Sequence, residues 1–313
     1  MDRLEGALDT PAPGARDPAP PRPPRVGALQ IEVPRDSIGA LDFLALRGCA
    51  LQVTVGKRNS SLGRLAAPSQ RLLLELEFLR LAPACAEQLR KEGRDELAAT
   101  LERTQASKRD QLPARIFNAT LAGEEFRAFW RAPAILGNYP AETSSEPASA
   151  LAAIEALAAR WLGGDYRADN EAFELLLATV ARGDGGALLA ALTLQGEALE
   201  RADAVLARRA AGGELCPGGL VPREVDILRT VVRKFFVGGV QPWSAAIERR
   251  RQQLLPPLRA LEKRLAAAQP AAYADWLRQR DAALALAHAP RRHVEAILGL
   301  LAACPGGPGL APA

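Results

Sequence analysis

The most constraining feature of this sequence is the spacing of its apolar residues. From about residue 37 to residue 304 they recur every three or four positions, which places them on one face of an α-helix. Glycine and proline interrupt this pattern at intervals, and no two neighbouring segments alternate as paired strands do. The pattern predicts an all-α fold, a multi-helix bundle of roughly ten to twelve helices.

One stretch near the N-terminus departs from the helical pattern. Residues 29–33 alternate between apolar and polar or small side chains, so we expect one short extended segment there that ends at Pro34. Ser37 is then expected to cap a helix that ends at Gly48.

Prolines and glycines predict where several helices begin and end. Pro68 fits the first position of a helix that should end before Pro83. Pro222 opens a helix that Gly238-Gly239 is expected to close, and Pro256-Pro257 should kink or split the following helix, because proline inside a helix costs about 3 kcal/mol.

The distribution of proline also suggests three regions. Residues 1–25 are predicted to be a tether, since residues 11–25 contain seven prolines and favour an extended conformation. Residues 26–304 form the helical body, whose expected point of subdivision is 132–149. Residues 305–313 are expected to be a disordered tail.

Composition and charge exclude several classes of function. The net charge is +4, and the surplus lies in the last third, where fourteen Lys and Arg stand against seven Asp and Glu between Arg223 and Cys304. Aromatic residues are not interleaved with base-reading residues there, so no nucleic-acid partner is predicted. Two histidines, four cysteines and one methionine provide few ligands, and we predict no metal and no cofactor. No continuous apolar run reaches the roughly 20 residues that span a bilayer.

The cysteines carry information about the compartment. Cys49, Cys85, Cys216 and Cys304 contain no close CxxC pair, and four cysteines allow three pairings. The pairing that matches the two halves of the body is Cys49 with Cys85 and Cys216 with Cys304, which is the disulfide prediction. Reduced cysteines packed as small apolar side chains are the alternative.

The strongest candidate site is a polar corner between residues 57 and 64. It collects cations, an amide and hydroxyls that could hold an anion: Lys57, Arg58, Asn59, Ser60, Ser61 and Arg64. A site predicts at least two unpaired donors facing a concavity. A merely structural corner predicts that acids such as Glu75, Glu77 or Glu124 fold back onto it, and that Asn59 bonds the backbone.

A catalytic role for this corner needs more than the sequence provides. Ser60 or Ser61 would require a base, and His288 and His293 are the histidines available. The strand-turn-helix elbow of serine hydrolases is missing from the pattern, so no catalytic residue is assigned.

Several segments resemble an uncharacterised bacterial family, domain of unknown function family 3080. The most specific are Lys57–Gly63 with Pro68–Leu73; Phe117–Thr120 and the turn at Leu215-Cys216-Pro217 are also similar. The likeness covers most of 26–304. It implies no established activity, fold or catalytic residue. Its members look like exported lipoproteins, which implies a periplasmic setting, and a leader and lipid-attachment cysteine that would stand before Asp2.

These observations lead to two hypotheses about function. The first is an envelope-tethered helical binding or scaffold protein, whose partner is an unknown envelope protein or an anionic ligand. It would contact a membrane, inner or outer, only through the lipid anchor. The alternative is an envelope hydrolase or transferase that uses a serine of the Lys57–Gly63 segment.

Overall fold

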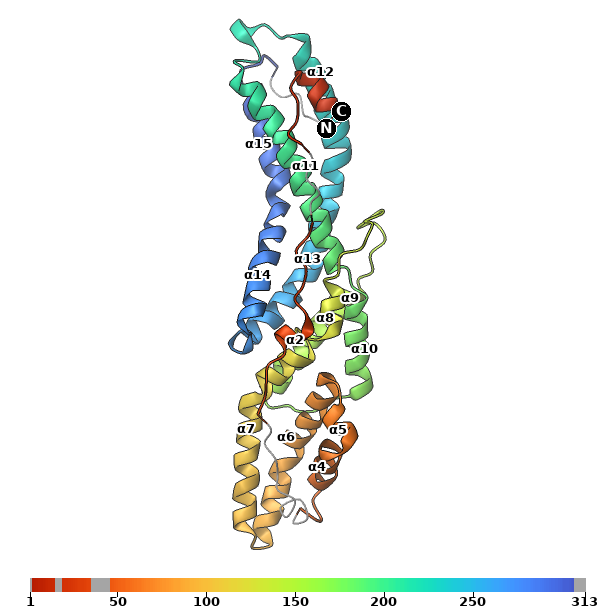
Figure 1. Ribbon diagram of the computed structural model, residues 1–313, viewed down its shortest axis with the longest axis vertical. Coiled ribbons are helices and arrows are strands. Elements are labelled where there is room, and N and C mark those ends of the chain that lie inside the picture. Colours follow the sequence, from red (N-terminus) through yellow and green to blue (C-terminus); the bar gives the residue numbers. More distant parts are fainter. Residues whose placement is uncertain (1, 15–18, 35–45, 307–313) are drawn as a thin grey trace.

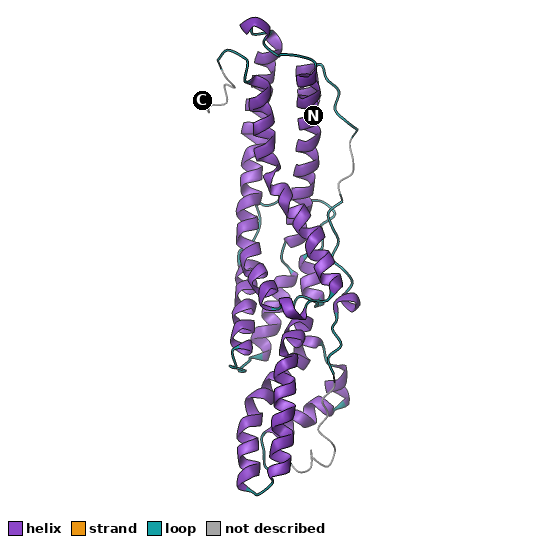
Figure 2. Cartoon of the chain, turned by 90° about the vertical axis from the view of Figure 1, so that its left-hand side faces the viewer, coloured by secondary structure: helices purple, strands orange, loops and turns teal. Residues whose placement is uncertain are grey.

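The computed structural model describes residues 2–14, 19–34 and 46–306, and the regular elements within them are helices, with no strand. The molecule is long and narrow (Figure 1, Figure 2). Ten of the described α-helices have at least nine residues, so the all-α prediction is confirmed. The α-helices are α1 Asp2–Leu8, α2 Val26–Leu29, α4 Leu51–Asn59, α5 Ser61–Leu65, α6 Pro68–Lys91, α7 Asp95–Ala119, α8 Glu124–Phe129, α9 Glu146–Leu162, α10 Asn170–Ala181, α11 Gly185–Ala211, α12 Arg223–Val231, α13 Gln241–Arg264, α14 Ala271–Leu284 and α15 Ala289–Leu301.

Shorter elements connect some of these helices. They are the 3-10 helices η1 Pro217–Gly219, η3 Ala266–Ala268 and η4 Ala285–His288, and the π-helix η2 Val232–Val240. The expected extended segment is seen in part: Leu29 ends α2, while residues 30–34 are neither helix nor strand. Most of the helix predicted from Ser37 to Gly48 lies outside the described residues.

Helix α6 begins at Pro68 as predicted, but it does not end before Pro83. It continues to Lys91 with Pro83 inside it. Leu72, Leu76 and Leu79 of the same helix are fully buried, and this packing offsets the cost of the proline.

The predicted helix end at Gly238-Gly239 is also wrong. From Arg223 to Arg264 the chain is helical throughout, as α12, η2 and α13 follow each other without a break. The two glycines lie inside the π-helix, and burial of Val232 and Phe236 there helps to offset their low helix propensity. Pro256 and Pro257 likewise lie within α13 and do not divide it into two helices.

Buried apolar side chains form three clusters along the molecule. The largest, the central cluster, includes residues of α6 to α11, α13 and α14. A smaller cluster at one end joins α1, α11, α12, η2 and α15, and we call it the α15 cluster. The third joins α4 with α6 and α7 at the opposite end, and we call it the α4 cluster (Figure 1).

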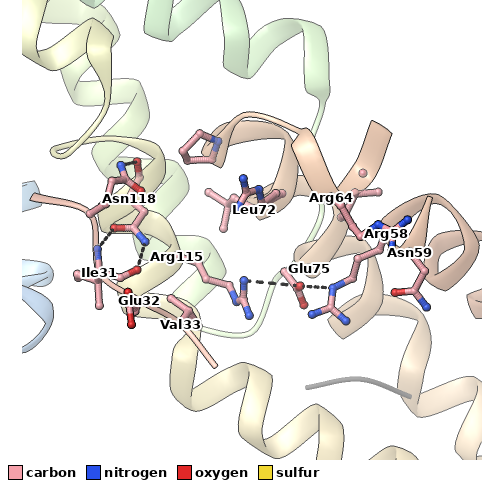
Figure 3. Close-up of a pocket in the computed structure, with 15 residues that line it drawn as sticks. Ile31, Glu32, Val33, Arg58, Asn59, Arg64, Leu72, Glu75, Arg115 and Asn118 are labelled. Atoms are coloured by element: carbon pink, nitrogen blue, oxygen red, sulfur yellow. Dashed lines mark hydrogen bonds and ion pairs between the residues drawn. The ribbon is translucent and has the colours of Figure 1, made fainter. Parts of the chain in front are cut away.

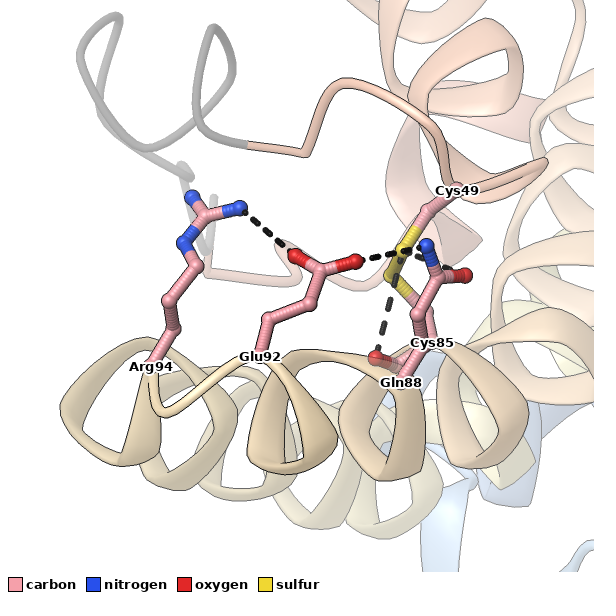
Figure 4. Close-up of a disulfide and its surroundings, with 5 residues drawn as sticks. All are labelled: Cys49, Cys85, Gln88, Glu92 and Arg94. Atoms are coloured by element: carbon pink, nitrogen blue, oxygen red, sulfur yellow. Dashed lines mark hydrogen bonds and ion pairs between the residues drawn. A yellow bond between two sulfur atoms is a disulfide. The ribbon is translucent and has the colours of Figure 1, made fainter.

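Each of the two smaller clusters contains one disulfide. Cys49 pairs with Cys85 in the α4 cluster, and Cys216 pairs with Cys304 in the α15 cluster, with Cα atoms 5.5 and 5.1 Å apart. Figure 4 shows the first bridge beside Gln88, whose amide nitrogen donates to Glu92 at 3.0 Å. The predicted pairing is confirmed.

The expected tether starts with a docked helix. Leu4, Ala7 and Leu8 of α1 are buried in contact with α11 and α12. The next residues lie along α11, where Arg208 donates to the carbonyl of Pro11 at 2.6 Å and Arg201 to that of Pro13 at 3.1 Å. Part of the region 1–25 is therefore held against the body.

The loop at 132–145 lies at the expected point of subdivision, but it does not divide the body into two hydrophobic cores. The central cluster includes residues on both sides of it. Of the expected tail, residues 307–313 lie outside the described residues. The stretch Asn170–Ala211, which includes α10 and α11, is long and apolar enough to cross a membrane by length and composition, although half of its most apolar window is buried inside the protein.

Candidate functional site

The predicted corner lies where α4 ends and α5 begins. The hydroxyl of Ser60 accepts a hydrogen bond from the Gly63 amide at 3.0 Å and donates one to the Lys57 carbonyl at 2.7 Å. A Cβ atom at Gly63 would stand only 2.2 Å from that carbonyl oxygen, so the position requires glycine. Ser60 and Gly63 therefore shape the turn.

Beside this corner one buried carboxylate contacts three cations. Glu75 on α6 is 2% exposed. Its Oε1 lies 2.8 Å from Nε of Arg58 and 3.7 Å from a terminal nitrogen of Arg115, and its Oε2 lies 2.5 Å from Nζ of Lys108. Arg58 comes from α4 and the other two cations from α7, so three helices meet at Glu75. Counted over these four described residues, three positive charges stand against one negative charge.

Lys108 is the most enclosed of the three cations. Its side chain is 0% exposed, and its ammonium lies 4.9 Å from the centre of the Phe78 ring. Burial lowers the pKa of Lys108; the charge of Glu75 opposes this effect, and the charges of Arg58 and Arg115 add to it. A further anion near this group would favour the charged ammonium.

A pocket of about 550 Å³, which we call the Glu75 pocket, opens next to Glu75 and its three cations (Figure 3). Side chains of α4, α5, α6 and α7 and the segment 30–33 line it. The charged residues among them are four arginines and two glutamates, so the described lining has a net charge of +2: Arg58, Arg64, Arg71, Arg115, Glu32 and Glu75. Lys108 stands behind Glu75 and adds one more positive charge.

Two exposed donors line the pocket without a partner among the described residues. Neither the amide of Asn59 nor the guanidinium of Arg64 forms a hydrogen bond or ion pair with that part of the chain. Arg71 donates from Nε to the Ala66 carbonyl at 2.7 Å, which holds its side chain at the junction of α5 and α6. The pocket therefore has hydrogen-bond donors at its exposed side and a buried charge cluster at its inner side.

The wall opposite the corner is the segment after α2. Asn118 on α7 accepts a hydrogen bond from the amide of Ile31 at 2.9 Å and donates one to the carbonyl of Ile31 at 2.8 Å. These are the two bonds that a neighbouring strand would supply. Asn118 thus holds the backbone of Ile31 at the edge of the pocket.

The structure combines features of both interpretations of the corner. Glu75 folds back onto Arg58, as a structural corner predicts, whereas Asn59 does not bond the backbone in the described part of the chain. Arg58, Asn59 and Arg64 line the pocket; Lys57, Ser60 and Ser61 are not among its lining residues. Sequence reasoning missed the roles of Lys108, Arg115 and Asn118. The signal available was their spacing, since Lys108 and Arg115 are seven residues apart and so share one face of α7.

Nothing in the described geometry pairs a corner serine with a histidine. Ser60 is engaged in capping α5, and no hydrogen bond joins it or Ser61 to a histidine within the described residues. His293 lies in the α15 cluster region, where its Nδ1 is 2.5 Å from Oδ1 of Asp203. Over the same residues, no three His, Cys, Asp or Glu side chains come together as a metal site would require.

Comparisons with known proteins give a family and no activity. A family model described as "Protein of unknown function (DUF3080)" matches residues 1–306. No curated protein and no solved structure matches this chain.

Proposed function

We propose that this chain, which belongs to the DUF3080 family of proteins of unknown function, is a helical binding protein whose Glu75 pocket takes an anionic group. The charge of the pocket is the observation that supports this most. Four arginines and two glutamates line it among the described residues, with Lys108 behind them. A positive lining attracts an anion, and the partly buried Arg58 and Arg115 would interact with it more strongly than exposed cations do, because less water screens them.

The donor types suit a phosphate or carboxylate group. Guanidinium groups present paired N–H donors that match the oxygens of these anions, and hydrogen bonds between ions are about twice as strong as neutral ones. Arg64 and Asn59 supply donors at the exposed side, while Arg71 is held in place by the Ala66 carbonyl. Glu75 orients the inner cations, and its negative charge offsets the repulsion between them.

We further propose that the protein works in the bacterial periplasm, attached to a membrane as the resemblance to exported lipoproteins implies. Two disulfides support an oxidising compartment, because cytosolic thiols are kept reduced. Fractionation of cells that produce the full-length protein should recover it with a membrane fraction and with no free thiols. Recovery in the cytoplasm with four free thiols would contradict this proposal.

The alternative of an envelope hydrolase or transferase has no observation in its favour. The hydroxyl of Ser60 already donates to the Lys57 carbonyl, and the pocket offers charge rather than a paired nucleophile and base.

Replacing Arg64 with Ala should weaken anion binding and leave the fold intact. Arg64 is exposed and forms no ion pair with another described residue, so the unfolding midpoint should not change. A charge-assisted hydrogen bond to the anion is lost, so affinity for inorganic phosphate should fall about tenfold. Isothermal titration calorimetry with phosphate, at constant ionic strength set by sodium chloride, measures this directly.

Arg249→Ala is the matched control. Arg249 is an exposed arginine of α13 that has no partner among the described residues and does not line the pocket. It should keep the affinity of the unmodified protein. If phosphate fails to bind the unmodified protein, or binds both variants equally, the anion proposal is wrong.

A further inference from the structure

Residues of α1, α11, η2 and α15 line a second pocket. Helices α11 and α15 run toward the end of the molecule that lies opposite α4 (Figure 1). The volume of the pocket is about 410 Å³, which lies within the usual range of small-molecule sites. Most of its walls are apolar, and the main contributors are Leu4, Leu194, Leu199, Val232, Phe235 and Phe236.

The π-helix builds much of this wall. Phe235 and Val240 both line the pocket and are five residues apart, which in a π-helix places them on one side. Trp243 extends the same wall into α13. Phe235 is 41% exposed, so a large aromatic side chain stands between the pocket and water instead of packing fully inside.

One buried acceptor on the opposite wall has no hydrogen-bond partner among the described residues. Gln195 on α11 lines the pocket and is 3% exposed. Its amide nitrogen donates to the Leu286 carbonyl at 3.4 Å. Its Oε1 is buried and accepts no hydrogen bond from the residues that the structure describes. A buried acceptor left in this state is costly, so a donor supplied by a ligand would bind it favourably.

The charged groups near this pocket are already occupied or lie at its edge. Nδ1 of His293 faces Asp203 at 2.5 Å, and the guanidinium of Arg3 lies 5.7 Å from the centre of the Phe235 ring. The interior therefore favours an uncharged ligand with one hydrogen-bond donor, which would meet the acceptor of Gln195.

We propose that this pocket binds an uncharged, mainly hydrocarbon molecule that carries one hydroxyl group. Its apolar part would pack against the aromatic side chains of η2, and its hydroxyl would donate to Oε1 of Gln195. The site is separate from the Glu75 pocket, because the two pockets share no lining residue.

Two probes of nearly identical shape test the hydrogen bond. 4-Hexylphenol carries a hydroxyl donor, whereas 4-hexylanisole has the same chain with that oxygen methylated. By calorimetry on the full chain, the phenol should bind at least about tenfold more tightly than the anisole. In Gln195→Met the side chain keeps its length but loses the acceptor, so the phenol should weaken to the level of the anisole.

Two tryptophan variants on α11 test the location. Ala198 lines the pocket and is exposed, so Ala198→Trp should block both probes without disturbing the core. Glu200→Trp introduces the same side chain at an exposed position that does not line the pocket, and should bind both probes normally. Equal affinities of phenol and anisole for the unmodified protein, or normal binding by Ala198→Trp, would overturn the proposal.

Discussion

Replacing Glu75 with Gln should destabilise the protein by about 3–5 kcal/mol, which is the usual result of leaving buried charge uncompensated. The substitution keeps the size of the side chain, so the loss reports charge rather than packing. Arg58, Lys108 and Arg115 would each lose the carboxylate that they now contact, and Lys108 is too enclosed to reach water instead. Chemical denaturation in phosphate-free buffer at pH 7 gives the free energy of unfolding.

Two further variants test whether the loss of stability is specific to the buried carboxylate of Glu75. Glu77→Gln changes a residue on the same helix that has no ion pair with any described residue, and it should cost less than about 0.5 kcal/mol. Lys108→Met should destabilise the protein much less than Glu75→Gln does. In this variant Glu75 keeps its contacts with two cations. The cost of burying the Lys108 charge, which lowers the pKa of Lys108, is also removed. If Glu75→Gln proves as mild as Glu77→Gln, the charge cluster does not stabilise the fold.

The helical class was predictable because burial of an apolar face follows directly from residue spacing. Several helix ends were not, and each failure has a physical cause. Pro83 and Gly238-Gly239 are poor helix residues, yet a proline costs about 3 kcal/mol and a glycine about 1 kcal/mol, and packing along a long helix exceeds these costs. Proline and glycine therefore predict a helix end only where the packing of the helix is too weak to offset their cost.

The predictable part of the candidate site is one contiguous run of residues, together with Glu75, which was one of three acids expected to fold back onto that run. Arg58, Asn59 and Arg64 fall within one short run, and their grouping was visible there. Glu75 and Lys108 come from neighbouring helices and are 33 residues apart. Their contact depends on the way α6 and α7 pack, which no local pattern specifies.

Replacing both Cys216 and Cys304 with Ser should destabilise the protein by about 4–5 kcal/mol, the value expected on the chain-entropy model for closing a loop of 88 residues. The bridge at Cys49 and Cys85 closes 36 residues, and its removal should cost slightly less, about 4 kcal/mol. Both disulfides lie in the small clusters, which bury less apolar surface than the central cluster and so depend more on the crosslinks. Denaturation of each double variant, compared with the unmodified protein, measures both values.

Removal of the two disulfides should have different effects on the Glu75 pocket. This difference distinguishes the two bridges more clearly than their effects on the free energy of unfolding do. Helix α4 supplies Arg58 to the pocket and packs in the cluster that contains Cys49–Cys85. Loss of that bridge should loosen α4, raise its backbone hydrogen exchange and weaken phosphate binding. Loss of Cys216–Cys304 should raise exchange in α15 and leave phosphate affinity unchanged, because none of the pocket residues lies in the α15 cluster. Equal losses of phosphate affinity in both variants would mean that the anion binds elsewhere or that the clusters do not unfold independently.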